Sequence, residues 1–519
     1  MSELDDPGVP FAPGGREAAR HVRGSSLLLA GRVISLGLNL LVQIGTVRVL
    51  SKEGYGIFAY ALSIAAVAEG ILGLGLHRAV SRFLPVYEEE GDSSRVLGTI
   101  ALTLATTLAG GCAAILLIVG LRGSLAGQLG SDPTAPLALA VLSLLAPLQG
   151  FDRIFLQLFS VFGRPRAIFV RRFVLGPTLR LAAVFVLTLR EGGPVSLAVG
   201  YVVAGVIGLF FYGTMLVGLL RERGLMNVAA FRRMQVPARE VFAFALPLLS
   251  TEIVFVGIQQ ADSLMLGHFV GAAGVASLRA VVPLARLNQV VLEIFGILFT
   301  PAAARMFSRA DHEGVNRLYW SATGWTAVLT FPIFAVTFSL ARPLTSLLFG
   351  PEYADSGALL ALLSLAHYVH ASLGPNGLAL GVYHRVRYTV AVNVLAFVLH
   401  IAGNLALIPV LGVAGAALAT TVTLVVHNLL KQWGLRGTGV RAWDPGGARP
   451  LMSVGAGVAA LVLLEFVFEP PGLVSAAAAA GAVVLVLAHA RASLDVHGAF
   501  PELVRVPWIR RLVGGRPHL

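Results

Sequence analysis

About fourteen apolar segments alternate along this 519-residue chain with connections that are in turn rich in arginine and almost free of charge. One set of connections, counted with both ends of the chain, holds 29 of the 39 lysine and arginine residues. The opposite set holds only Arg48, Lys52, Arg122, Arg190 and Arg342. Lysine and arginine near the ends of membrane spans accumulate on the cytoplasmic side. The alternation therefore predicts a multi-pass membrane protein with an even number of helices and both termini in the cytoplasm.

The composition supports a membrane protein. Hydrophobic residues make up 56% of the chain and charged residues 13%, whereas soluble domains carry about 25% charged residues. The net charge of +12 fits basic residues at the ends of spans, beside anionic membrane lipids, so no nucleic-acid partner is expected. The only cysteine, Cys112, lies in an apolar run, and the chain therefore has no disulfide framework and no cysteine metal site.

Apolar stretches of about 20 residues, the length that crosses a bilayer, predict an all-α polytopic membrane protein with about 14 transmembrane helices. Four short segments recur in the same order at offsets between 218 and 223 residues, beginning with Leu50–Gly56 and Val270–Ala276. They predict a six-helix duplication, with two lobes related by an axis along the membrane normal. The predicted organisation is a disordered cytoplasmic tail at 1–24, an N-terminal six-helix lobe at 25–222, a basic cytoplasmic linker at 223–240, a C-terminal six-helix lobe at 241–435, a basic cytoplasmic connection at 436–450, two additional transmembrane helices at 451–490 and a basic cytoplasmic tail at 491–519.

The sequence shows no pattern for catalysis or for a cofactor. The sparsely charged connections are all short, which leaves no room for the external domain that membrane glycosyltransferases and polymerases usually need. The phosphate-binding pattern G-x-x-x-x-G-K-[ST] of ATP-driven pumps is absent, as are metal-ligand spacings and nucleophile elbows. We therefore expect no enzymatic activity, no metal and no cofactor.

Charged residues inside the spans are the candidates for function. A charge at the bilayer centre costs about 2.5–3.5 kcal/mol on insertion scales, so such side chains normally face protein or water and mark a pathway. The spans contain five arginines and five acids, so the charge of a cavity does not follow from their count and depends on which acids pair with arginines elsewhere: Arg32, Arg153, Arg180, Arg279, Arg286, Glu69, Asp152, Glu252, Asp262 and Glu293.

The first span carries one polar stripe. Its polar side chains follow one another at steps of three, four, four and three residues, which places them on a single helix face: Arg32, Ser35, Asn39, Gln43 and Thr46. Such a stripe either lines a cavity or forms polar contacts between packed helices, which contribute about 1 kcal/mol each in membranes.

The seventh and eighth spans carry similar stripes. In the eighth, Arg279, Arg286 and Glu293 lie seven residues apart on one face, and Pro283 is expected to kink the helix between the two arginines. In the seventh, Glu252, Gln259 and Ser263 share one face with Asp262 beside them. Glu252 and Glu293 are either ion-coupling or substrate sites, or salt-bridge partners of Arg286.

Three weaker candidates lie elsewhere in the spans. Either Asp152 or Arg153 is expected to pair with Arg180 on the next helix. His367 and His370 share a face of the tenth span, and a face of the eleventh carries Asn393, His400 and Asn404. A titratable histidine such as His367 can couple transport to protons, although a histidine inside a membrane is more often a hydrogen-bonded packing residue.

Several segments of the chain resemble the Wzx-type polysaccharide flippases of the multidrug/oligosaccharidyl-lipid/polysaccharide superfamily. The resemblance covers roughly residues 25–490 and rests on the segments Val47–Phe58, Gly73–Leu76 with Arg82, Asp262 with Gly267 and Gly271, Phe349–Tyr353, Asn404–Pro409 and Gly412–Thr420. The first span, Leu29–Ile34, does not look like that of the peptidoglycan lipid flippases.

The resemblance implies 14 helices, two lobes around a central cavity and outward translocation of a polyprenyl-diphosphate-linked oligosaccharide across the plasma membrane. It places the first, seventh and eighth spans at the lobe interface. The substrate would then meet Arg32, Asn39, Gln43, Arg279 and Arg286, and Glu252, Asp262, Glu293 and His367 would serve as ion-coupling residues or salt-bridge partners. Other glycan-assembly membrane proteins are expected partners. The alternatives are a multidrug or amphiphile exporter of the same superfamily and a membrane glycosyltransferase or polymerase.

Overall fold

The computed structural model describes residues 15–130, 132–190, 192–226, 232–441, 443–468 and 470–493. Within these ranges the chain forms helices and no β-strand. Fourteen helical stretches are long and apolar enough to cross a membrane, from Gly31–Val49 to Gly472–Ala490. The prediction of an all-α polytopic membrane protein with 14 spans is confirmed.

The first six spans form an N-terminal lobe, in which neighbouring helices such as α1 and α8, α4 and α6, and α8 and α9 pack together. Its elements are α1 (Gly15–Val49), α2 (Lys52–Leu72), α3 (Leu76–Glu89), α4 (Ser93–Gly127), α5 (Ala135–Ser143), α6 (Leu145–Val161), α7 (Pro165–Ile168), the π-helical segment η1 (Phe169–Leu175), α8 (Gly176–Arg190) and α9 (Pro194–Glu222).

The next six spans form a C-terminal lobe, and the last two pack against its helix α14. The elements of this half are α11 (Ala238–Phe269), α12 (Ala272–Arg286), η2 (Leu287–Gln289), α13 (Val290–Ser308), α14 (His312–Ser339), α15 (Ala341–Phe349), η3 (Pro351–Tyr353), α16 (Ser356–Leu373), α17 (Pro375–Val382), α18 (Val386–Leu411), α19 (Val413–Gly434), α20 (Pro445–Leu463), η4 (Leu464–Phe468) and α21 (Gly472–Ser493).

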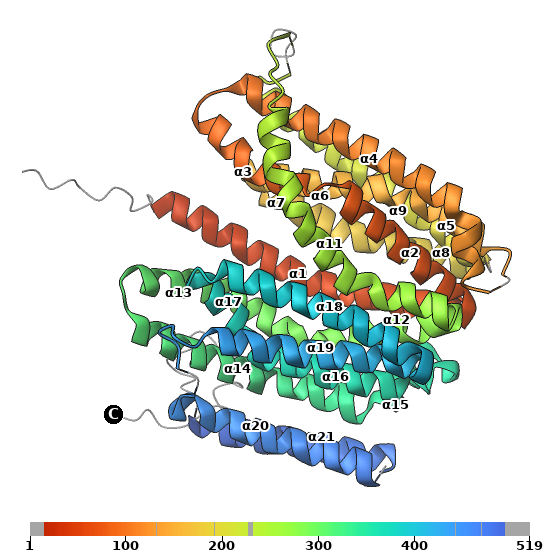
Figure 1. Cartoon of the computed structure of the whole chain (residues 1–519), viewed down its shortest axis with the longest axis vertical. Coiled ribbons are helices and arrows are strands. Elements are labelled where there is room, and N and C mark those ends of the chain that lie inside the picture. The colour runs from red at the N-terminus through yellow and green to blue at the C-terminus, as the bar shows by residue number, and fades with distance from the viewer. Residues whose placement is uncertain are drawn as a thin grey trace, which may run out of the picture.

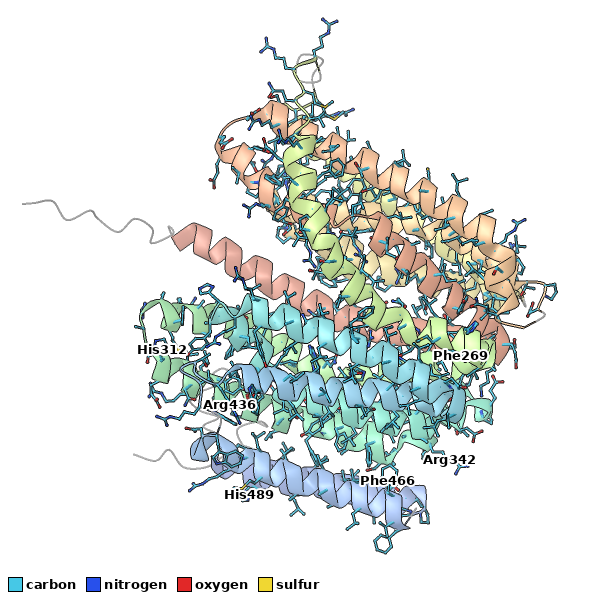
Figure 2. The ribbon with its side chains drawn as sticks, viewed as in Figure 1. Phe269, His312, Arg342, Arg436, Phe466 and His489 are labelled. Atoms are coloured by element: carbon cyan, nitrogen blue, oxygen red, sulfur yellow. The ribbon has the colours of Figure 1, made fainter. Side chains whose placement is uncertain are left out.

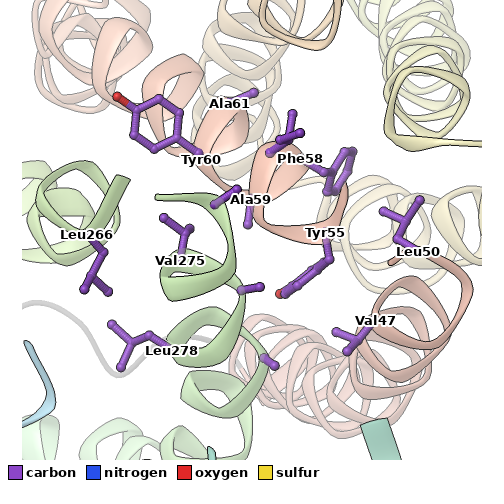
Figure 3. Close-up of a cluster of buried hydrophobic side chains, with 14 of the residues drawn as sticks. Val47, Leu50, Tyr55, Phe58, Ala59, Tyr60, Ala61, Leu266, Val275 and Leu278 are labelled. Atoms are coloured by element: carbon purple, nitrogen blue, oxygen red, sulfur yellow. The ribbon is translucent and has the colours of Figure 1, made fainter. Parts of the chain in front are cut away.

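The two lobes meet at one end of the molecule and diverge toward the other, with α1 running between them (Figure 1). At the closed end α2 packs against α11 and α12. Figure 3 shows side chains of this contact, including Tyr60, Leu266 and Val275, which are buried in one hydrophobic cluster. The approach is close, because a β-carbon on Gly56 would lie 1.9 Å from the backbone oxygen of Ala272. Only glycine permits this contact between the lobes.

Basic side chains also join the lobes at the closed end. Arg48 Nε donates to the backbone oxygen of Leu348 at 2.8 Å, and Lys52 Nζ donates to that of Glu352 at 2.8 Å. Phe269 and Arg342 lie at this end, whereas His312 and Arg436 lie at the opposite end (Figure 2). The closed end is therefore the one that the charge alternation predicts to face outward.

Two boundaries differ from the expected ones, and a third predicted segment lies mostly outside the described residues. Helix α1 begins at Gly15, so the disordered tail predicted for 1–24 is wrong for its last ten residues, and residues 1–14 lie outside the described ranges. The second span ends at Leu72, and α3 follows as a separate amphipathic helix whose Leu76 and Leu84 are buried. The basic tail predicted at 491–519 lies mostly outside the described residues, since α21 ends at Ser493.

Interrupted helices occur at corresponding places in the two lobes. In the second span the helix breaks after Leu72, and in the eighth span it breaks at Leu287–Gln289. The fourth span is broken at Leu144 and the tenth at Gly374. These are matching members of the two predicted six-helix repeats. The breaks support the duplication, which stays a prediction.

Candidate functional site

A cavity of about 1330 Å³ lies between the lobes, with α1, α6, η1 and α8 on one side and α11, α12, α13, α16, α18 and α19 on the other. Most of the candidate residues predicted from the sequence line it: Arg32, Asn39, Asp262, Arg279, Arg286, Glu293 and His367. Gln43, farther along α1, lines a smaller adjoining cavity instead. The polar stripe of the first span thus faces open space, not a packed neighbour, along most of its length.

The wall of the large cavity is electropositive. Nine basic side chains line it, against the three acids Asp152, Asp262 and Glu293: Arg32, Arg78, Arg153, Arg171, Arg172, Arg180, Arg279, Arg286 and Lys431. The balanced count of five arginines and five acids in the spans left this charge open, because it depends on which acids pair elsewhere. Glu69 and Glu252 are buried and do not line this cavity, and additional basic residues near the span ends turn into it.

Ion pairs neutralise four of these basic groups. Arg32 pairs with Glu293 across the two lobes. In the other three pairs the guanidinium nitrogen lies 2.6 Å from the carboxylate oxygen: Arg171 to Asp152, Arg78 to Glu252 and Arg153 to Glu69. Among the described residues, the remaining five have no ion-pair partner: Arg172, Arg180, Arg279, Arg286 and Lys431. A cluster of cations facing one water-accessible space is a site for an anion.

The two arginines of α12 differ in how freely they can meet a ligand. Arg286 is exposed to the cavity, and its guanidinium donates to the side chain of Gln259. Arg279 is half-buried and donates to Ser63 at 3.0 Å and to Ser263 and Gln260. Since Ser63 belongs to the other lobe, Arg279 also holds the lobes together.

Helix α12 continues through Pro283 to Arg286, and the 3₁₀ segment Leu287–Gln289 follows, so the kink at Pro283 stays a prediction. Proline cannot donate to the carbonyl four residues earlier, which here is that of Arg279. Gln43 Nε2 donates to this carbonyl at 3.2 Å and lies 2.8 Å from the hydroxyl of Tyr55. Gln43 therefore compensates for Pro283, a role that the polar stripe alone did not reveal.

The acids on α11 and α13 do not pair with Arg286 in this conformation. Glu252 pairs with Arg78 and lies 3.9 Å from Arg153, while Glu293 pairs with Arg32. His77 Nε2 lies 3.7 Å from Glu252. Burial lowers the pKa of His77, and Arg78 makes the shortest ion pair with Glu252. Glu252 thus links the lobes through α3, an element that the sequence did not predict.

The expected pairing with Arg180 is also wrong. Asp152 pairs with Arg171, and Arg153 pairs with Glu69 on α2. Arg180 lies over the ring of Tyr201, with 5.7 Å from its guanidinium carbon to the ring centroid. Asp152 and Arg153 point in different directions, as adjacent helical residues must. Arg171 on η1 is the cation that pairs with Asp152.

Asp262 is the centre of a buried polar cluster at the cavity wall. It accepts from Asn404 Nδ2 at 2.8 Å and from Thr420 Oγ1 at 3.0 Å, and His400 Nε2 lies 3.0 Å away. His367 bonds instead to Gln289 at 2.9 Å. Among the described residues, no group of three or more histidine, cysteine or acidic side chains is arranged to hold a metal ion.

Four cavity residues were missed because they were counted with the cytoplasmic connections: Arg78, Arg171, Arg172 and Lys431. A signal was present for three of them. Arg171 and Arg172 fall inside the apolar stretch 167–189, and Lys431 closes the stretch 412–431. For Arg78 there was none, because α3 was not expected.

Comparison with known proteins identifies the family. A family model described as "Polysaccharide biosynthesis protein" matches residues 21–307, more than half of the chain. The succinoglycan biosynthesis transport protein ExoT of Rhizobium meliloti (strain 1021) is 26% identical over 368 residues, which span 68% of this chain and 66% of that protein's length.

Two solved structures share the fold at low sequence identity. The lipid II flippase MurJ, in an inward closed conformation, superposes with a TM-score of 0.67 at 12% identity over 90% of this chain and 98% of its own. A multidrug resistance MATE transporter in an inward-facing conformation gives a TM-score of 0.57 at 16% identity, over 77% of this chain and 93% of its own. The two structures show the fold, and the match to the family model over more than half of the chain shows that the chain belongs to the polysaccharide biosynthesis protein family.

Proposed function

We propose that the chain is a flippase that moves a polyprenyl-diphosphate-linked oligosaccharide from the inner to the outer leaflet of the plasma membrane, for cell-surface polysaccharide biosynthesis. The observation that carries this proposal is the cluster of five basic side chains without ion-pair partners among the described residues, in a cavity between two lobes. The names of the flippase and of the succinoglycan transport protein that the chain resembles support it.

The cavity suits a diphosphate joined to sugars. Guanidinium groups bind phosphate oxygens through paired, charge-assisted hydrogen bonds, and Arg286 is exposed for this purpose. Neutral polar side chains such as Asn39 and Gln259 would bind sugar hydroxyls, and the polyprenyl tail would stay in the lipid. Outward movement of negative charge across an inside-negative membrane is favourable by about 2.3 kcal/mol per charge per 100 mV. The membrane potential can therefore contribute to the driving force for outward transport of the substrate.

Alternating access supplies the mechanism. The contact between Gly56 and Ala272 closes the end predicted to face outward, so with this topology the structure would be an inward-open state. Opening the outer end would separate these residues and break the bonds of Arg48 and Lys52 to the C-terminal lobe. The cluster around Asp262 is the candidate for ion coupling, because its half-buried carboxylate lies within hydrogen-bond distance of titratable and polar groups at the cavity wall.

A multidrug exporter is the second candidate from the same superfamily. Cationic drugs would meet nine basic side chains in the cavity wall against three acids, and like charges repel. The electropositive wall therefore favours an anionic substrate. Anionic membrane lipids near the basic connections and other glycan-assembly proteins are proposed partners.

Deletion of the gene tests the proposal in the cell. Surface polysaccharide should fall to near the detection limit, and its lipid-linked precursor should accumulate with the sugar facing the cytoplasm, because synthesis continues without export. Mass spectrometry of extracted lipids measures the precursor, and complementation with the wild-type gene is the control. Normal polysaccharide together with increased sensitivity to cationic drugs would identify an exporter instead.

The predicted topology places Asp6, Arg233 and Arg516 in the cytoplasm of a cell whose inner membrane holds the protein, because basic residues mark the cytoplasmic side. Single cysteines at these positions, in a Cys112→Ser background, should react with a membrane-impermeant maleimide only after the cells are opened. A cysteine at Glu352, near the closed end, should react in intact cells. External labelling at any of the first three positions contradicts the topology.

A further inference from the structure

A second cavity of about 420 Å³ opens from the large one into the N-terminal lobe. The two cavities share the side chains of Arg171, Arg180, Arg279 and Arg286, which form the mouth of this side chamber. Its deeper wall comes from α1, α2, α6, α9 and α11 and carries uncharged side chains only, among the residues that the structure describes. The side chamber is thus a neutral pocket behind a cationic entrance.

The deeper wall combines aromatic rings with neutral hydrogen-bonding groups. Tyr55 and Tyr201 contribute rings from α2 and α9, and Gln43, Ser63 and Gln260 contribute amide and hydroxyl groups. A sugar ring presents apolar C–H faces and a rim of hydroxyls, which match rings and neutral polar groups respectively. The volume lies within the range of about 300–1,000 Å³ that small-molecule sites occupy.

Two buried polar atoms at the mouth lack a partner within the protein. They are Nε of Arg171 and Oδ1 of Asp152, although the two residues bond to each other through their other atoms at 2.6 Å. Buried polar groups are normally hydrogen-bonded, so each exception needs an explanation. The pair of Arg171 and Asp152 therefore keeps one unused donor and one unused acceptor beside the mouth of the chamber.

We propose that the side chamber binds the uncharged sugar nearest the diphosphate, while the arginines at its mouth that have no ion-pair partner among the described residues, Arg180, Arg279 and Arg286, hold the phosphates. This inference rests on the proposed function, because only a substrate that joins a diphosphate to a sugar fills both parts. It assigns substrate selection to the wall of the chamber, with Tyr201 and Ala66 as the residues that face the sugar. A sugar with bulky substituents on its first ring would be excluded.

Two probes separate the contributions of phosphate and sugar. One is a short prenyl diphosphate, and the other is the same lipid diphosphate carrying a single hexose. Both are titrated against the full-length protein in detergent. The wild-type protein should bind the hexose-bearing probe about tenfold more tightly, which corresponds to about 1.4 kcal/mol.

Ala66→Leu fills the chamber and should remove the tenfold advantage of the hexose without changing the affinity for the prenyl diphosphate. The matched control is Ala109→Leu on α4, where the side chain is exposed on the outer surface of the lobe. Tyr201→Phe removes one hydroxyl only and should reduce the advantage in part. If Ala66→Leu does not fold, Tyr201→Phe tests whether the side chamber binds the hexose.

The possible outcomes separate the two proposals. If the wild-type protein binds neither probe, the proposed function fails. If it binds both equally, or if Ala66→Leu and Tyr201→Phe both keep the full advantage of the hexose, the side chamber is not the sugar site. The proposed function then stands without it.

Discussion

Replacing Arg286 by alanine should reduce glycan export at least tenfold while the protein stays in the membrane at its normal level. The side chain is exposed to the cavity, and its only described hydrogen bond is to Gln259, so little packing is lost. A hydrogen bond to a charged group contributes about 1.5–3 kcal/mol, and bidentate contact to phosphate would be lost entirely. Export per unit of membrane-inserted protein is the quantity to measure.

Two further variants sharpen this prediction. Arg286→Lys should rescue export only in part, because an ammonium group cannot reproduce paired contacts to phosphate. Arg342→Ala, at an exposed position outside the cavity, should export normally. Normal export by Arg286→Ala would refute its role. If Arg286→Ala lowers the level of the protein and a second substitution at Glu252 or Glu293 restores that level, Arg286 belongs to a structural salt bridge instead.

Replacing Arg171 by alanine should instead destabilise the protein. Arg171 is 6% exposed, pairs with Asp152 at 2.6 Å and lies over the ring of Tyr212. Its guanidinium occupies the space where a β-carbon on Gly208 would lie. Removing one partner of a buried pair costs about 3–5 kcal/mol. The lower end, about 3 kcal/mol, is expected because the Asp152 side chain is 34% exposed.

The neighbouring residue is the matched control for this variant. Arg172 lies on the same π-helical segment and lines the same cavity, but its side chain is exposed. Arg172→Ala should therefore unfold at the wild-type temperature in detergent, whereas Arg171→Ala should unfold well below it. Equal unfolding temperatures for the two variants would show that the pair with Asp152 contributes nothing to stability.

The sequence predicted the architecture well because the bilayer restricts it. Spans must be about 20 apolar residues long, and the helices that cross a membrane satisfy their own backbone groups. Polar residues at helical spacing in such spans also indicated a cavity face. For this reason the sequence predicted Arg32, Asn39 and Arg286 as cavity residues, and all three line the large cavity of the structure.

The partners of these residues could not be predicted, because pairing depends on the packing of helices far apart in the chain. For Glu252 the sequence left open a pairing with Arg286, yet helix α3, which was not expected, brings Arg78 to it. The same packing buries Glu69 and Glu252 away from the large cavity and directs Arg171, Arg172 and Lys431 into it. The charge of the wall therefore emerged only from the structure. The role of Gln43 depended likewise on the carbonyl that Pro283 leaves free on another helix.

Transfer of a prenyl diphosphate that carries one hexose between the leaflets of a liposome tests the central claim most directly. The purified protein is reconstituted, and the exposure of the hexose to a lectin in the external solution is followed over time. The cationic cavity predicts transfer well above that of protein-free liposomes and its loss in Arg286→Ala, with no transfer of a cationic amphiphile. Transfer of the cationic amphiphile, with none of the diphosphate-linked hexose, would contradict the proposed function.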